Sequence, residues 1–240
     1  MSNKSAMLND IIKVEDIGDR YIAELEAVYR RIISNINKLI GRPDIILTAQ
    51  DIQNVLVDSG YYQVGEGVLT IGQQEVMQRS VDYYEKQLKM KGITYGENAV
   101  NILESMRTVS ADSYTLLGDT LAQKLTKEIT NVSLGLASQD SISEAVQKAL
   151  DLTYAQSKTW VHTAISEIHR TSTVLLGEQA NIQYWEYWGP DDQLTRPFCQ
   201  EHLGQIKTME EWKAMDNGQT GSVATDGAGY NCRHRLVPAA

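Results

Sequence analysis

The chain has 240 residues, a net charge of −9, four histidines and two cysteines. That length is enough for a hydrophobic core, and two cysteines are too few for the disulfide framework of a small secreted protein. The excess of acidic residues argues against bulk nucleic-acid binding, because such binding depends on basic side chains that neutralise phosphates.

The first twenty residues, MSNKSAMLNDIIKVEDIGDR, carry acidic side chains where a signal peptide would have its apolar core. No apolar run approaches the roughly 20 residues that a membrane span needs. We therefore expect a soluble chain made inside the cell, with no membrane partner.

Apolar residues at steps of three and four predict an amphipathic helix from Ile17 to Ile40, which ends at the segment GRP. Thr48 is expected to cap a short helix that continues through Leu56. The glycine-rich segment 58–72, DSGYYQVGEGVLTIG, predicts a loop or a small hairpin.

Further helices are predicted over about 73–90 and 97–118, and Asp119 is expected to begin another. A turn and a short capped helix precede the last long helix, predicted over 153–179. Together these segments predict a helical body over residues 1–180.

The composition changes after Asn181. The aromatic segment QYWEYW favours a strand, RHRLVP alternates like a second strand, and the glycine-rich stretch between them is irregular. We expect residues 181–240 to form a separate module with too few aliphatic side chains to hold itself together. The predicted fold class is mainly α, with an elongated helical body, a small C-terminal α+β module, and zinc as the candidate staple of that module.

Both cysteines of the chain lie beside histidines near the C-terminus, in Cys199-x-x-His202 and Cys232-x-His234. The first spacing lets two side chains of one turn point at one ion, and the second places two side chains on the same face of an extended segment. Thiolate sulfur and imidazole nitrogen are the ligands of structural zinc. The pattern predicts a closed zinc site whose binding energy contributes to folding of the module. Its ligands are Cys199, His202, Cys232 and His234.

Three other interpretations of these residues stay open at this point. The cysteines can be ordinary buried thiols, they can form a Cys199–Cys232 disulfide, or a cysteine and a histidine can act as a catalytic pair. The spacing of Cys199 and His202 suits chelation as well as activation of a nucleophile.

Other polar and aromatic groups predict structure rather than chemistry. His162 and His169 lie seven residues apart and are expected at a partly buried polar edge of the last helix. Glu167 and Arg170 are expected to pair on the surface. The aromatic run 184–188 is expected to pack a small sheet against helices rather than to stack nucleobases.

The segment from Ala164 to Pro238 resembles the phage Mu protein F-like family, the minor head or head morphogenesis proteins of tailed phages and prophages. Its most specific part here is the terminal string NCRHRLVP, which matches the family pattern N-C-R-x-x-L-x-P. The matching residues are Ser166, Glu167, Arg170, Trp188, Asp191 or Asp192, Arg196, Cys199, His202, Leu203, Gly204, Asn231, Cys232, Arg233, His234, Leu236 and Pro238.

Two positions depart from the family pattern. Gly229 and Tyr230 stand where many members have His-Pro, and His234 stands where many have cysteine. The first departure removes a candidate metal ligand, and the second keeps one. The helical body before Ala164 matches no family that we recognise.

The resemblance implies a structural role. Family members are regarded as minor capsid proteins at the portal vertex that bind the portal protein and procapsid or scaffold components. They assist head assembly, DNA packaging or ejection. The expected location is the virion, with the host cytoplasm during assembly, and no small-molecule substrate is expected.

Two alternative functions are carried alongside. The C-terminal module can be a metal-dependent nuclease or a toxin-like effector, in which Cys199, His202 and His234 activate water. Asp191, Asp192 or Arg196 would then assist. The chain can also be a plain helical adaptor in which the cysteines and histidines have no chemical role.

Overall fold

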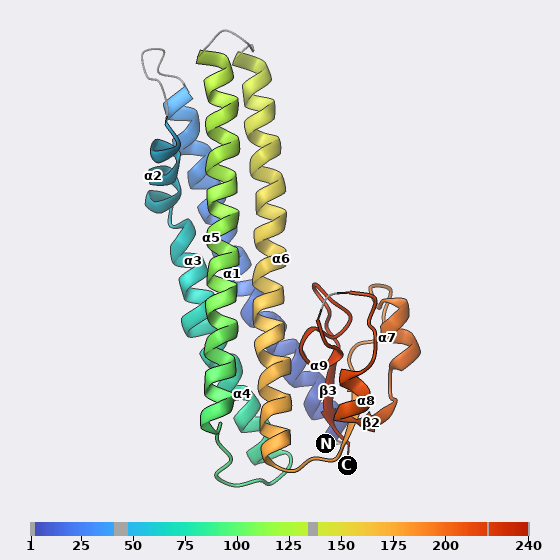
Figure 1. The fold of residues 1–240 in the computed structure, drawn as a ribbon. Helices are drawn as coiled ribbons and strands as arrows, with labels where there is room; N and C mark the ends of the chain where they lie inside the picture. The colour runs from blue at the N-terminus through green and yellow to red at the C-terminus, as the bar shows by residue number, and fades with distance from the viewer. Residues whose placement is uncertain (1–2, 41–47, 134–138, 220, 240) are drawn as a thin grey trace. The chain divides into compact units, whose positions relative to one another are not determined.

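A computed structural model describes residues 3–40, 48–133, 139–219 and 221–239 of the chain (Figure 1). Helices dominate these residues, and three short strands form one antiparallel sheet near the C-terminus. The predicted mainly α class with a small C-terminal part of mixed helix and strand is therefore confirmed.

The three longest helices are α1 (Asn3–Ile40), α5 (Glu97–Ser133) and α6 (Gln139–Gln179). The predicted break near Gly118 was wrong, because α5 continues through it. A Cβ atom at Gly118 would lie 2.7 Å from the Tyr62 hydroxyl, so glycine at this position serves close packing rather than termination. In α6 the predicted short helix and the last long helix are one continuous helix.

The segment predicted as a loop or hairpin over 58–72 is helical, and this prediction was wrong. Gly60 lies between two helices with a φ of 88°, in the left-handed conformation that glycine adopts readily. The predicted cap is confirmed, because the Thr48 side chain accepts a hydrogen bond from the Asp51 amide. The elements here are α2 (Ala49–Ser59), α3 (Tyr61–Gly67), a π-helix (Val68–Gly72) and α4 (Gln73–Lys86).

The sheet has the order β2-β1-β3, and both neighbours of the central strand run antiparallel to it. Its strands are β1 (Tyr184–Trp188), β2 (Ile206–Thr208) and β3 (Arg235–Pro238). Trp185 and Tyr187 are fully buried, as the alternation of side chains along a strand requires for the inward face. Three short helices lie between the strands: α7 (Pro197–His202), α8 (Met209–Lys213) and α9 (Val223–Asp226).

The chain divides into two compact units, and each of the three longest helices supplies residues to both. The first unit comprises residues 1–18, 69–108 and 162–240, and the second comprises 19–68 and 109–161. All three strands belong to the first unit. The domain boundary proposed at residue 180 stays a prediction, but residues 162–180 share this unit with the C-terminal strands.

Two hydrophobic clusters form the core of the first unit. One is mainly aromatic and contains the two cysteines, and its residues are Val174, Trp185, Tyr187, Cys199, Met209, Trp212, Val223, Ala224, Ala228, Cys232 and Leu236. The other joins segments far apart in sequence and consists of Met7, Ile11, Tyr83, Tyr84, Leu176 and Val237. The C-terminal strands thus pack on side chains from α1, α4 and α6.

Tyrosines are prominent in the core of the second unit. The rings of Tyr61 and Tyr114 stack with centroids 4.6 Å apart. The hydroxyls of Tyr29 and Tyr61 lie 3.3 Å and 3.1 Å from the Ser157 hydroxyl, so the polar ends of buried rings meet one another. This pairing satisfies groups that would otherwise be costly to bury.

Candidate metal centre

The two Cys/His segments of the sequence converge in the first unit. Cys199 lies in α7, which begins with a proline at its first position, where the missing N–H costs nothing. Cys232 and His234 lie in the extended segment that leads into β3. All three side chains are buried.

Cys199, Cys232 and His234 form a group that can hold a metal ion, because their ligand atoms all lie within 4.8 Å of one another. The two sulfur atoms are 3.8 Å apart and both cysteines are free. Two thiolates on one tetrahedral zinc would stand about 3.8 Å apart, given Zn–S bonds of about 2.3 Å. Two thiols in van der Waals contact reach a similar spacing, so the adjacent imidazole is what makes the group a ligand set.

The nitrogen of that imidazole is available for coordination. The Nε2 atom of His234 is buried and has no hydrogen-bond partner. A buried polar atom without a partner is unfavourable, and a metal ion would satisfy it. The side chain therefore fits a ligand better than it fits an ordinary core histidine.

Two glycines make room for the ligands. A Cβ atom at Gly189 would lie 2.5 Å from the His234 ring, and one at Gly227 would lie 2.9 Å from the Cys232 sulfur. Gly227 also has a φ of 61°, a conformation that other residues rarely adopt. Gly189 and Gly227 thus allow the backbone to approach the His234 ring and the Cys232 sulfur more closely than other residues would.

The sulfur atoms of Cys199 and Cys232 lie in hydrogen-bond contact. The hydrogen bond between them lowers the pKa of Cys232 and raises the pKa of Cys199, and burial also raises the pKa of Cys199. The guanidinium of Arg170 favours the thiolate on Cys232. One thiolate is therefore already favoured at this position, and it is the thiolate that binds metal.

The fourth ligand predicted from the sequence, His202, lies outside the group of three. It ends α7, and its ring packs against Phe198 with centroids 4.4 Å apart. Its Nδ1 atom is buried without a hydrogen-bond partner. The structure thus brings three of the four predicted ligands together and leaves His202 one helical turn from Cys199 on the same helix.

The prediction of a surface pair between Glu167 and Arg170 was wrong. Arg170 is 3% exposed and donates hydrogen bonds to the carbonyl oxygens of Thr225 and Cys232 at 2.5 Å and 2.7 Å. These hydrogen bonds therefore tie α6 to the segment that carries two of the candidate ligands, Cys232 and His234. A spacing of three residues between opposite charges could not reveal this role, because the partners are backbone atoms far along the chain.

Two more arginines fasten the loops around the group. Arg196 donates hydrogen bonds to the carbonyl oxygens of Ala228 and Tyr230. Arg233 forms a bidentate ion pair with Asp192, with N–O distances of 2.8 Å and 2.6 Å. The hydrogen bonds from Arg233 lower the pKa of Asp192 to about 2. Loop 190–196 is thereby tied to the segment that precedes β3.

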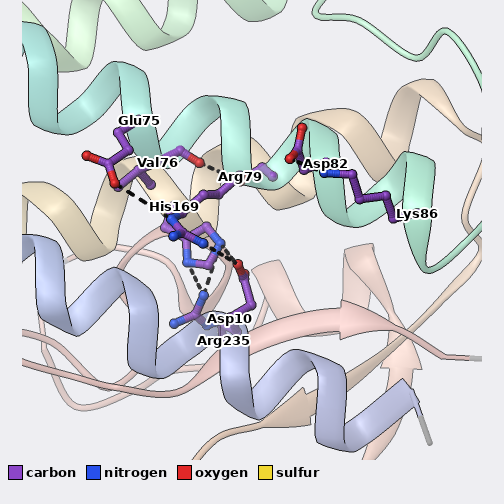
Figure 2. A network of polar contacts seen from close by, with 9 residues as sticks. Asp10, Glu75, Val76, Arg79, Asp82, Lys86, His169 and Arg235 are labelled. Carbon is purple, nitrogen blue, oxygen red and sulfur yellow. Dashed lines mark hydrogen bonds and ion pairs between the residues drawn. The ribbon is translucent and has the colours of Figure 1, made fainter. Parts of the chain in front are cut away.

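A buried polar network contains Arg235, the residue that follows His234 in the chain (Figure 2). Asp10 of α1, His169 of α6 and Arg235 of β3 meet, with His169 Nε2 3.0 Å from the Asp10 carboxylate and Nδ1 facing the Arg235 guanidinium. Arg79 of α4 lies 4.0 Å from the same carboxylate. Burial and the charge of Arg235 lower the pKa of His169 to about 4, so the imidazole is neutral at pH 7.

Sequence reasoning missed these supporting residues. His169 was expected at a partly buried polar edge, whereas it is 1% exposed and lies between the Asp10 carboxylate and the Arg235 guanidinium. Tyr187 was expected only as an aromatic strand residue, although its hydroxyl reaches the sulfur of Cys199 at 3.4 Å. The sequence does hold one signal for this position. Side chains two residues apart in a strand lie on the same face, so Tyr187 is expected on the same face as Trp185.

Comparison of the chain with known protein families, with curated proteins and with solved structures finds no match. Among the described helices, none is both long and apolar enough to cross a membrane.

Proposed function

We propose that the Cys/His group is a structural zinc centre with Cys199, Cys232 and His234 as ligands and His202 as the fourth. Two thiolates neutralise a dication, and two neutral imidazoles complete a tetrahedral set without leaving net charge in a buried site. The buried Nδ1 of His202, which has no partner, supports its assignment. Its ring would have to turn toward the sulfurs when the ion binds.

We further propose that the chain is a minor capsid protein of a tailed phage or prophage, a head morphogenesis protein that binds the portal protein and procapsid. The observation that carries this proposal is the arrangement of the residues that resemble the phage Mu protein F-like family. Arg170, Arg196 and Arg233 each bond to a loop around the cysteines. These bonds hold the loops around the proposed zinc centre in place, and a protein that docks on a large assembly needs such a rigid surface.

The proposed partners and location follow from the same role. The chain would act in the virion, at the capsid interior or portal vertex, after assembly in the host cytoplasm. With a net charge of −9 it would meet protein surfaces in the head rather than coat the genome.

A metal-dependent nuclease or toxin-like effector is the weaker candidate. Catalytic zinc keeps an open position for water, whereas the three converging ligand residues are buried. Asp192 and Arg196, the residues expected to assist such chemistry, are already bonded to Arg233 and to backbone carbonyls. A nuclease assay with Mg²⁺, Mn²⁺ and Zn²⁺ tests this candidate, and metal-dependent cleavage that Cys199→Ser abolishes would establish it.

Metal content of the purified chain tests the zinc centre. We expect about one zinc per chain by mass spectrometry, and its loss in Cys199→Ser together with a lower thermal midpoint. In His202→Ala we expect weaker binding rather than complete loss, because three ligands remain. A metal-free wild-type chain prepared without chelator would refute the centre.

Association with the portal tests the assembly role. We expect the chain to co-sediment with portal rings or procapsids of the phage or prophage that encodes it. Cys199→Ser should weaken this association if the stapled module makes the contact, whereas Glu201→Gln on the same helix should not. A wild-type chain that sediments alone in the presence of both would refute the proposal.

A further inference from the structure

Tyr187 contacts every member of the Cys/His group. Its hydroxyl lies 3.4 Å from the Cys199 sulfur and 3.8 Å from the Cys232 sulfur. Its ring stacks on the His234 ring, with centroids 5.6 Å apart and planes at 13°. The side chain is fully buried in the central strand of the sheet, so its position is fixed by β1 rather than by the metal.

Chemistry allows this hydroxyl two roles beside a metal ion: a fourth ligand as phenolate, or a hydrogen-bond donor as phenol. Charge decides between them. Two thiolates already balance a divalent ion, and a phenolate would leave a net negative charge in a buried site, which is strongly unfavourable.

We propose that Tyr187 is a positioning residue of the metal centre, whose hydroxyl donates a hydrogen bond to the Cys199 thiolate while its ring orients His234. This inference rests on the proposed zinc centre and deepens it. A donor beside a thiolate withdraws electron density from the sulfur, as outer-shell partners of metal ligands do elsewhere. It thereby stabilises the negative charge that two adjacent thiolates bring to a buried site when the ion binds.

The Tyr187→Phe variant isolates this effect. Phenylalanine keeps the buried ring and its stacking on His234 and removes only the oxygen. Outer-shell substitutions typically weaken metal binding by about 10- to 100-fold, and we expect a loss in that range. Tyr184→Phe is the matched control, because Tyr184 lies on the same strand but is 57% exposed.

Titration of the full chain with Co²⁺ in place of zinc supplies the readout. The sulfur-to-cobalt charge-transfer absorption should move to longer wavelength in Tyr187→Phe, because a thiolate that has lost its hydrogen bond gives up electron density more easily. The Tyr184→Phe spectrum should match the wild type. Circular dichroism in the near ultraviolet establishes that both variants are folded.

The outcomes separate the two proposals. A wild-type chain that binds no cobalt or zinc would overturn the metal centre and this inference with it. A wild-type chain that binds cobalt, together with a Tyr187→Phe variant of equal affinity and unchanged charge-transfer absorption, would overturn only the role of Tyr187. A tyrosinate absorption that appears when wild-type protein binds zinc would show that the hydroxyl is a ligand and not a donor.

Discussion

Glu167 lies next to a second carboxyl group, that of Asp226. Burial raises the pKa of Glu167 to about 7, the nearby Arg170 opposes this shift, and Asp226 adds to it. Asp226 itself accepts hydrogen bonds from the Ser222 amide at 2.9 Å and the Thr225 hydroxyl at 2.6 Å. The folded protein therefore favours the neutral carboxyl form of Glu167 more than the unfolded chain does.

This pair predicts a pH dependence of stability. The usual pKa of Glu167 is 4.5 and its folded value is about 7, so the folded chain binds the proton more tightly than the unfolded chain. The resulting stabilisation is complete below about pH 4.5 and is lost as pH rises through about 7. Glu167→Gln is always neutral, so its thermal midpoint relative to wild type should rise steadily between pH 5 and pH 8.

Glu201→Gln serves as the control for that measurement, since Glu201 is exposed on α7. Its thermal midpoint should follow the wild type across the same range. If the thermal midpoint of Glu167→Gln also followed that of wild type at every pH, the raised pKa of Glu167 would be refuted.

At the scale of the helices and strands, local pattern predicted a good part of the structure. Thr48 and Asp51 form the helix cap that threonine and aspartate favour at these positions. The aromatic run 184–188 forms the predicted strand, β1. Two of the errors, the break near Gly118 and the loop over 58–72, involve glycine. Gly65 and Gly118 lie inside helices where a Cβ atom would collide with Tyr114 or Tyr62. A glycine that makes room for a distant tyrosine cannot be distinguished, from sequence alone, from one that ends a helix.

Gly177 in α6 gives a direct test of this use of glycine. A Cβ atom there would lie 2.1 Å from the Trp185 ring and 2.5 Å from the Tyr84 hydroxyl, and both side chains are fully buried. Alanine would gain up to about 1 kcal/mol of helix propensity. Overpacking a filled core costs about 1–3 kcal/mol, and two immobile rings place this site at the upper end.

We therefore expect Gly177→Ala to lower the free energy of unfolding by about 1–2 kcal/mol, as measured by equilibrium unfolding in urea. Gln156→Ala, at an exposed position of the same helix, should leave it unchanged or slightly higher. A Gly177→Ala chain as stable as that control would mean that α6 and β1 do not pack as closely as this contact requires.

For the whole molecule, the sequence located the candidate site but not its surroundings. Short spacings in Cys199-x-x-His202 and Cys232-x-His234 identified three groups that do converge. The residues around them come from elsewhere: Arg170, which bonds to the Cys232 carbonyl, lies in α6, and Asp10, which pairs with His169 beside Arg235, lies in α1. One sequence carries no record of which distant segments meet, so these contacts could not be predicted from it.

The same contacts bear on whether residues 181–240 form a domain of their own. Arg235 is 4% exposed, and burial lowers its pKa to about 10 even with Asp10 nearby. Its partners His169 and Asp10 both lie outside 181–240. Cutting the chain at residue 180 would remove these partners, together with the apolar side chains of α1, α4 and α6 on which Val237 of β3 packs.

We therefore expect the fragment 181–240 to remain unfolded even with stoichiometric zinc, with poorly dispersed amide signals in a nitrogen–proton NMR spectrum. The full-length chain under the same conditions should give dispersed signals for these residues. Zinc binding to the fragment is expected to be weaker, because the ion must then provide all the folding free energy that Arg170 and the Asp10 network supply in the intact chain. A dispersed spectrum for the zinc-loaded fragment would show instead that the metal alone holds this region together and that residue 180 is a true boundary.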